Sequence, residues 1–245
     1  MISIIVNNYN RSYLLPLIMK AYTWLSTQVP AEMIIVDDES DPKDHFQDYV
    51  KLGLDTVKPW YRVRAFRAYD TKRNNGVTLN IGVKQSVGDT LILNHSDVVP
   101  VTPGVLEKVL DRHKATPNLY LTPKVVCSHP DFPVRGMSLP LGASVSRELF
   151  YRIGGFDERF IGYGPVDVDF SYRIIHGMAD LGCRWFEDPV IVYMHLEQAK
   201  LPIRDGYKNK EENERILLEN EHQRVRIVNQ SGWGVCPRLE EIKLE

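Results

Sequence analysis

Two segments of the chain combine acidic residues with the glycines and polar residues that a catalytic site needs. The first, Leu91 to Pro100, reads LILNHSDVVP and carries Asp97 after an apolar run. The second, Gly154 to Arg173, reads GGFDERFIGYGPVDVDFSYR and carries Asp167 and Asp169 where a helix is expected to begin. A carboxylate can hold a metal ion on a phosphate, and an ionised carboxylate can accept a proton. The pair of segments therefore predicts a transfer reaction that uses a metal ion and a general base.

Glycine-rich phosphate loops are absent from the sequence. No GxGxxG follows the first apolar run, and no GxxxxGK[ST] occurs anywhere. This argues against a dinucleotide oxidoreductase and a P-loop NTPase. A divalent metal ion is the natural alternative, because it can bridge phosphate oxygens to a carboxylate. Asp97 is the best-placed carboxylate for that role.

The second segment has the features of a helix start. Pro165 sets φ for the first turn, Phe170 to Ala179 continues with helical spacing, and Gly182 follows. Asp167 then lies in the first turn, where the helix dipole favours its ionised form. The alternative is that Asp167 and Asp169 only cap and charge-match the helix.

Composition is consistent with one enzyme domain. The chain has 245 residues, 43% of them hydrophobic, and a formal net charge of -2, which argues against a binder of duplex DNA or anionic membranes. Its three widely spaced cysteines favour a reducing compartment. No leader sequence is evident, and no apolar run approaches the roughly 20 residues of a membrane span. We expect a cytoplasmic protein, with at most peripheral membrane contact.

Apolar runs alternate with amphipathic stretches along the first half of the chain. Strands are expected at 3–6, 33–36, 63–68 and 90–93, and helices at 13–25, 46–52 and 78–86. This alternation predicts an α/β fold with a mostly parallel sheet and helices on both faces. The polar loops 7–11, 37–41 and 94–97 should meet at the carboxyl ends of the strands, although ordinary turn chemistry also favours such residues.

From Ser3 to about His195 the chain resembles the family 2 glycosyltransferases, which have the GT-A fold. The motifs that carry this resemblance are SIIVNNYNR, IIVDDESD, NNGVTLNIGVKQSVGDTLILNHSD, GGFDERF and GYGPVDVDFSYR. The resemblance implies an inverting transferase that moves a sugar from a nucleoside diphosphate to an acceptor hydroxyl, with UDP as the favoured nucleotide. The implied nucleotide and donor residues are Asn8, Asp37, Asp38, Asn75, Asn80, Ser96 and Asp97.

The resemblance also implies a Mn²⁺ or Mg²⁺ ion. The family's Asp-x-Asp corresponds here to His95-Ser96-Asp97, so an imidazole replaces one carboxylate and Asp97 becomes the principal ligand. His95 is a further ligand, a contact to the diphosphate or a filler, and a non-ligand role is favoured. His195, after VIVYM, is the second metal candidate, and its alternative is a strand-end histidine bonded to a carboxylate.

On the acceptor side, Asp167 corresponds to the family's catalytic base. Val166 stands where the family usually has Glu, which points to an unusual acceptor or weakened activity. Gly164, Val166 and Trp233 are the acceptor-binding candidates, and Trp233 is either a stacking platform for a sugar or a core residue. Loops at 135–138 and 193–204 are further candidates for closing over the donor.

The charge-rich stretch from Tyr207 to Val228 predicts one long C-terminal helix. We expect a catalytic domain at 1–205 and a helical extension at 206–245. The partial apolar stripe of this helix favours packing on its own domain, with a homodimer contact or a membrane surface as alternatives. Losses at His95 and Val166 keep a second function open, that of a non-catalytic domain that binds nucleotide or glycan.

Overall fold

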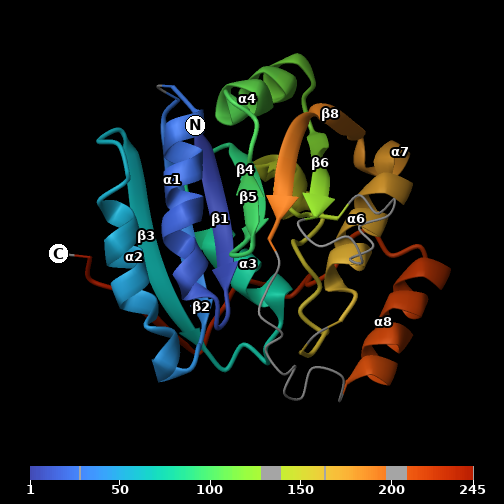
Figure 1. Ribbon diagram of the computed structural model, residues 1–245. Coiled ribbons are helices and arrows are strands. Elements are labelled where there is room, and N and C mark those ends of the chain that lie inside the picture. The colour runs from blue at the N-terminus through green and yellow to red at the C-terminus, as the bar shows by residue number, and fades with distance from the viewer. Residues whose placement is uncertain (28, 128–138, 163, 197–208, 245) are drawn as a thin grey trace.

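The computed structural model describes residues 1–27, 29–127, 139–162, 164–196 and 209–244. Within them the strands form one nine-stranded sheet in the order β5-β8-β6-β7-β4-β1-β2-β3-β9. Figure 1 shows this sheet with helices in front of it and behind it. The expected loop at 135–138, residues 197–204 of the expected loop at 193–204, and the expected domain boundary at 205 lie outside the described residues, whereas residues 193–195 belong to a strand.

The centre of the sheet is parallel, as the sequence predicts. It consists of β1 (Ile2–Asn8), β2 (Ala31–Asp38), β3 (Tyr61–Tyr69) and β4 (Thr90–His95), with β1 between β2 and β4. The register pairs Asn8 with Asp37 and Asn7 with His95. The polar residues that follow the apolar runs therefore meet at one edge of the sheet.

The other strands were only partly predicted. They are β5 (Val98–Pro100), β6 (Leu119–Cys127), β7 (Ala143–Ser146), β8 (Arg184–His195) and β9 (Arg238–Glu241). Strands β6 and β8 are parallel to each other, whereas β7 runs antiparallel to both β4 and β6. Because β5 pairs with β8 in antiparallel fashion, Val98 lies opposite His195. This pairing brings the late strand to the end of β4.

Most predicted helices are present with shifted ends. The helices are α1 (Leu15–Leu25), α2 (Phe46–Leu54), α3 (Asn75–Gln85), α4 (Val105–Ala115), α5 (Arg147–Arg152), α6 (Val166–His176), α7 (Met178–Leu181) and α8 (Lys210–His222). Single 3-10 turns occupy Ser12–Leu14 and Pro42–Asp44. None of the helices in the described ranges is long and apolar enough to cross a membrane.

Two apolar cores cover the two faces of the sheet. In β1, Ile4 and Val6 belong to the core that α1, α2 and α4 cover, whereas Ile5 belongs to the core shared with α3, α5 and α6. This alternation follows from the period of two along a strand. The fold is the α/β fold that the sequence analysis predicted, with a mixed sheet whose central strands are parallel.

The C-terminal helix is shorter than predicted. It ends at His222, not at Val228, because Arg224 adopts a left-handed φ of 51° and the N–H of Val225 bonds to the carbonyl of Asn220. Helix α8 lies beside α6, and the chain then runs behind the sheet to add β9 next to β3 (Figure 1). Ile216 and Val228 are buried, and Ile216 belongs to the core shared with α3, α5 and α6, whereas Leu218 of the predicted stripe is exposed.

Candidate functional site

The end of β1 is joined to the end of β2 by side-chain hydrogen bonds. The amide of Asn8 donates to Asp37 Oδ1 and to Ser12 Oγ, each at 2.8 Å. Arg67 Nε lies 3.0 Å from Asp37 Oδ2, so the fully buried Asp37 is an ion-paired carboxylate. Asn8 and Asp37 together fix the shape of this strand end.

The neighbouring Asp38 is also buried, but it is less completely compensated. Thr71 Oγ1 donates a hydrogen bond to its carboxylate, and Arg73 donates to its backbone carbonyl at 2.7 Å. Burial raises the pKa of Asp38 to about 6, although the bond from Thr71 and the charge of Arg73 oppose that effect. The fold therefore keeps the carboxylate of Asp38 at the strand ends although its burial costs desolvation free energy.

Asp97 lies between two cationic or potentially cationic side chains. Arg11 Nη1 is 3.1 Å from Asp97 Oδ2, and His195 Nε2 is 3.6 Å from the same oxygen. The β5–β8 pairing carries His195 there, and the N–H of Leu196 bonds to the carbonyl of Asp97 at 2.8 Å. Burial lowers the pKa of His195, although Asp97 opposes this, so the neutral imidazole that a metal ligand requires is favoured.

Asp167 faces His95 across the junction between β4 and α6. Their closest atoms, Asp167 Oδ2 and His95 Nε2, are 3.9 Å apart. Among the described residues, the buried atoms His95 Nε2 and Asp167 Oδ1 have no hydrogen-bond partner. Burial raises the pKa of Asp167, and the negative charge of Asp97 raises it further. The positive charge of a protonated His95 would lower it. The two segments singled out in the sequence thus meet at this point.

The residues around Asp97 fit a divalent cation only in part. In the described parts of the chain, no group of three or more His, Cys, Asp or Glu side chains could hold a metal ion. Asp97 and His195 offer one oxygen and one nitrogen 3.6 Å apart, a spacing that suits two neighbouring ligands. Such a pair fits an ion that takes its remaining ligands from a diphosphate and water, as Mg²⁺ commonly does.

The predicted donor residues on α3 lie in two different environments. Asn75 is partly exposed in the first turn of α3, next to the N-cap residue Asn74. Asn80 is fully buried, and its amide exchanges hydrogen bonds with the backbone of Phe156 at 2.9 Å and donates to Glu158 at 2.8 Å. Asn80 therefore binds the loop before α6, and its position does not support the predicted contact with the donor.

The predicted acceptor-binding residues also lie in different environments. The side chain of Val166 is buried in the apolar core beside α3, because a valine at this helix start gains by leaving water. A side-chain contact from Val166 to an acceptor is therefore unsupported. Gly164 lies against Asn213 of α8, whose Nδ2 would be 2.4 Å from a Cβ added to the glycine.

Trp233 fills the core, which was one of its two predicted roles. Its ring lies 4.8 Å from that of Tyr151 and 5.4 Å from that of Phe150, and Lys84 Nζ is 4.1 Å from the ring centroid. Lys84 belongs to the last turn of α3, whereas the first turn of that helix adjoins the carboxyl ends of the strands. Trp233 is thus packed away from Asp97 and Asp167, so a stacking role toward the acceptor is unsupported.

The sequence analysis missed Arg11 as a site residue. It follows the first polar loop in SIIVNNYNR, and only the folded register places it on Asp97. Its signal was a lone basic residue beside a strand end, which turn chemistry explains equally well. Ser96, the predicted donor-site residue between His95 and Asp97, is buried, and its N–H bonds to the carbonyl of Asn7 at 3.1 Å.

Comparison with solved structures places the fold among sugar transferases. TarS residues 1–349 from S. aureus, in complex with UDP-GlcNAc, matches with a TM-score of 0.66 and 14% identity over 88% of this chain and 65% of that one. A mannosyltransferase from Pyrobaculum calidifontis, in complex with GDP-Man and Mn²⁺, matches with a TM-score of 0.60 and 18% identity over 84% of this chain and 59% of that one. The chain therefore spans less than two thirds of the length of either structure.

The search of curated proteins returned no match. The sequence model of glycosyl transferase family 2 matches residues 3–170, which include every strand-end residue described above except His195. That segment is more than half of the chain and contains both Asp97 and Asp167. This chain therefore belongs to glycosyl transferase family 2.

Proposed function

We propose that the protein is a metal-dependent, inverting glycosyltransferase that uses a nucleoside diphosphate sugar, with UDP as the favoured nucleotide. The observation that carries the proposal is the meeting of Asp97, flanked by Arg11 and His195, with the partly buried carboxylate of Asp167, whose buried Oδ1 has no hydrogen-bond donor in the described chain. Asp97 is suited to hold a metal ion on a diphosphate, and Asp167 is suited to accept a proton. The family match supports the reaction class.

Asp167 is the proposed general base. It accepts the proton of the acceptor hydroxyl while the acceptor oxygen bonds to the anomeric carbon and the bond from that carbon to the diphosphate oxygen breaks. The electron pair of the broken bond leaves with the nucleoside diphosphate. The position of Asp167 in the first turn of α6 supports this role, because the helix dipole favours its ionised form.

Asp97 and His195 are the proposed holders of a Mn²⁺ or Mg²⁺ ion. When bound, the ion would neutralise the charge that develops on the leaving diphosphate. Arg11 is included in the diphosphate site, because a guanidinium binds phosphate oxygens in a bidentate manner and this one already lies on Asp97. His95, whose Nε2 lies 3.9 Å from Asp167 Oδ2, is assigned to the reacting sugar side and not to the metal.

Asn8, Asp37 and Asp38 are proposed to form the wall of the nucleotide site, with Asn75 and Ser96 nearby. Their place at the carboxyl ends of parallel strands supports this, since ligands of open α/β sheets bind there. The solved complexes of TarS contain UDP or UDP-GlcNAc, which favours UDP for this chain over GDP. A cytoplasmic location remains a proposal based on the composition of the chain.

A non-catalytic GT-A domain that binds nucleotide or glycan is the second candidate. It is favoured by one observation, the replacement of an acid by His95, which leaves Asp97 and His195 as a pair of candidate ligands in the described site. Such a domain would still bind nucleotide, so binding alone does not separate the two candidates. Turnover does.

The test is a thermal-shift panel of UDP, GDP, dTDP and CDP, each with and without Mn²⁺, followed by assays of nucleotide release from the matching sugar donors. A ligand that binds only the folded state raises its stability by mass action. We expect a Mn²⁺-dependent shift with UDP and measurable UDP release. A shift without release from any sugar donor would favour the second candidate as a nucleotide-binding domain. No shift with any nucleotide would refute the glycosyltransferase and favour the second candidate as a glycan-binding domain.

A further inference from the structure

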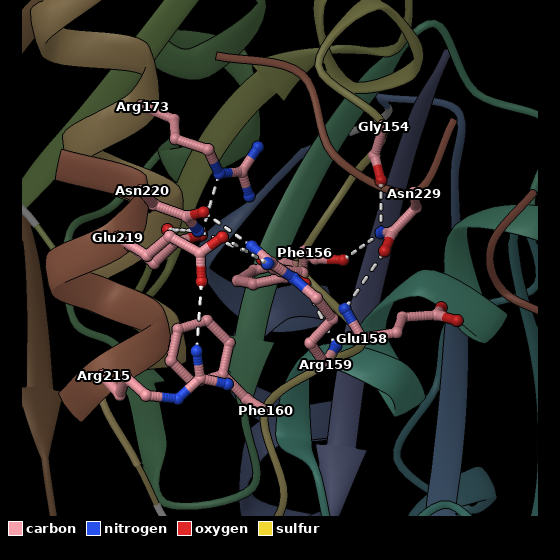
Figure 2. A network of polar contacts seen from close by, with 12 residues as sticks. Gly154, Phe156, Glu158, Arg159, Phe160, Arg173, Arg215, Glu219, Asn220 and Asn229 are labelled. Atoms are coloured by element: carbon pink, nitrogen blue, oxygen red, sulfur yellow. Dashed lines mark hydrogen bonds and ion pairs between the residues drawn. The ribbon is translucent and has the colours of Figure 1, made fainter. Parts of the chain in front are cut away.

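The loop 154–164 leads from α5 into α6 and ends just before Asp167. Its described residues, 154–162 and 164, form no strand or helix that would fix its path. Three asparagines of the C-terminal part of the chain bind it instead, and they are Asn213 and Asn220 on α8 and Asn229 after it. Figure 2 shows Asn220 and Asn229 approaching the loop from opposite sides. We call residues 209–229 the C-terminal clasp.

Asn229 binds the start of the loop. Its Nδ2 donates to the carbonyls of Gly154 at 2.9 Å and Phe156 at 2.6 Å, and its Oδ1 accepts from the N–H of Glu158 at 3.2 Å. Gly154 has a positive φ of 74°, and a Cβ there would lie 2.0 Å from the carbonyl oxygen of Val228. The first residues of the loop are therefore in close contact with the end of the clasp.

Asn220 binds the middle of the loop and α6 at the same time. Its Nδ2 donates to Asp157 Oδ2 at 3.0 Å and to Asp169 Oδ1 at 2.7 Å, while its Oδ1 accepts from Arg159 at 2.6 Å. Asp169 is also paired with Arg173 at 2.8 Å, and both of those side chains are fully buried. One neutral amide thus links the carboxylate of Asp157, which is ion-paired with Arg159, to the carboxylate of Asp169, which is ion-paired with Arg173.

Asn213 binds the end of the loop. Its Oδ1 accepts from the N–H of Ile161 at 3.0 Å, and its Nδ2 donates to the carbonyl of Ile161 at 2.8 Å. Its side chain also packs on Gly164, where any larger residue would collide with it. Asn213 therefore contacts the end of the loop just before Asp167, whereas Asn220 contacts Asp169 just after it.

The buried polar face of α8 is unusual for a helix that only packs on a core. The buried residues of α8 are Asn213, Ile216 and Asn220, so two amides lie where apolar side chains would be expected. Burying an amide costs free energy unless all its groups are bonded, and a fully bonded set selects one geometry. This specificity would be unnecessary if the position of the loop did not matter.

We propose that the C-terminal clasp is a positioning element of the acceptor half of the site. Through Asn213 and Asn220 it holds the loop 154–164 and the first turn of α6, so that Asp167 stays opposite His95. The clasp lies beyond residue 170, where the family match ends, and the inference rests on the proposed function. Asn213, Asn220 and Asn229 act through Asp167 and touch no reacting atom.

The experiment compares Asn213→Ala, Asn220→Ala and Asn229→Ala with the control Glu214→Gln. Glu214 lies on the same helix, and its ion pair with Lys210 is exposed. The turnover assay is UDP release from whichever of UDP-GlcNAc, UDP-glucose and UDP-galactose the parent protein uses fastest. UDP binding with Mn²⁺ is measured separately by calorimetry.

We expect kcat to fall roughly 10- to 100-fold in Asn213→Ala, because small displacements of a reacting group cost rates of that order. The KM for the donor and the Kd for UDP with Mn²⁺ should stay within about twofold of the parent. Asn229→Ala should have the smallest effect on kcat, since it binds the part of the loop farthest in sequence from Asp167. A general loss of folding would instead lower binding and turnover together.

Amide hydrogen exchange gives a readout that needs no turnover. Residues 156–169 should exchange faster in Asn213→Ala than in Glu214→Gln, while β1 and β4 remain unchanged. Unchanged exchange there, or unchanged kcat in both Asn213→Ala and Asn220→Ala, would overturn the proposal. If the parent protein binds UDP but releases none from any donor, the proposed function fails even where faster exchange supports the clasp as a restraint on the loop.

Discussion

The proposed donor half and the proposed acceptor half of this site are built by different means. The donor half consists of the ends of β1, β2 and β4, where neighbouring strands in register bring Asn8, Asp37 and His95 together. The acceptor half depends on a loop that side-chain amides hold from a distant part of the chain. Backbone pairing between strands positions the residues at a sheet edge, whereas a loop is positioned by contacts with other parts of the chain. The two halves should therefore fail in different ways when they are mutated.

The strongest test of this difference is Asp167→Asn in the acceptor half. We expect kcat to fall by roughly 10²- to 10⁴-fold, the usual contribution of a general base, with UDP binding retained. Steady-state kinetics and calorimetry measure the two effects, and Asp180→Asn, at an exposed carboxylate on α7, is the control. A parent-like kcat in Asp167→Asn would remove the assignment of the base.

Trp233→Ala should separate stability from catalysis. Loss of a buried tryptophan costs about 3 to 5 kcal/mol in the free energy of unfolding, because it leaves a cavity against Phe150 and Tyr151. Urea unfolding measures this cost. At temperatures where the variant is folded, its KM for any acceptor should equal that of the parent. A selective rise of that KM would return Trp233 to the acceptor site.

Asp38→Asn tests the cost of the donor half. Because the folded pKa of about 6 lies above the unfolded value of 3.8, the native state binds more protons than the unfolded state between these values. The contribution of Asp38 to stability therefore falls as pH rises through that window, by at most about 3 kcal/mol. Asp38→Asn should flatten this pH dependence in urea unfolding and weaken UDP binding. The exposed neighbour Glu39, changed to Gln, should do neither.

Asp97→Asn should have the smallest effect on the unliganded protein and a clear one on its ligand response. At a UDP concentration 100 times the Kd, bound ligand stabilises the parent by about 2.7 kcal/mol. We expect the Mn²⁺-dependent part of that stabilisation to disappear in Asp97→Asn. An equal Mn²⁺ dependence in variant and parent would place the metal elsewhere. Asp89→Asn, at an exposed carboxylate, serves as the control.

The central sheet was predictable because its signal is local. Apolar β-branched runs identify β1 to β4, and parallel strands end at one edge, so residues after each run must meet there. Strands β5, β7 and β9 are three or four residues long and carry little periodicity of their own. Their pairing partners define them, and a single sequence does not display those partners.

The site residues also divide into those with a local sequence signal and those defined by distant contacts. Asp97 and Asp167 were identifiable from motifs, and the structure brings them to the same region. Asn80, Val166 and Trp233 were placed by resemblance or by residue type, yet each is held inside the protein by contacts with residues far away in sequence. Asn213 and Asn220 were overlooked because polar residues on a charge-rich helix normally face water. Only the folded chain reveals that they face inward.

The contact between Gly154 and Val228 has a consequence for the order of folding during synthesis. Chains fold from the N-terminus as they emerge from the ribosome, so the parallel strands can assemble while residues 209–229 are still being made. The loop before Asp167 gains its partners only after those residues have been released. A nascent chain would then be able to bind a nucleotide before it could transfer a sugar, and stalled or truncated products would retain the first ability alone.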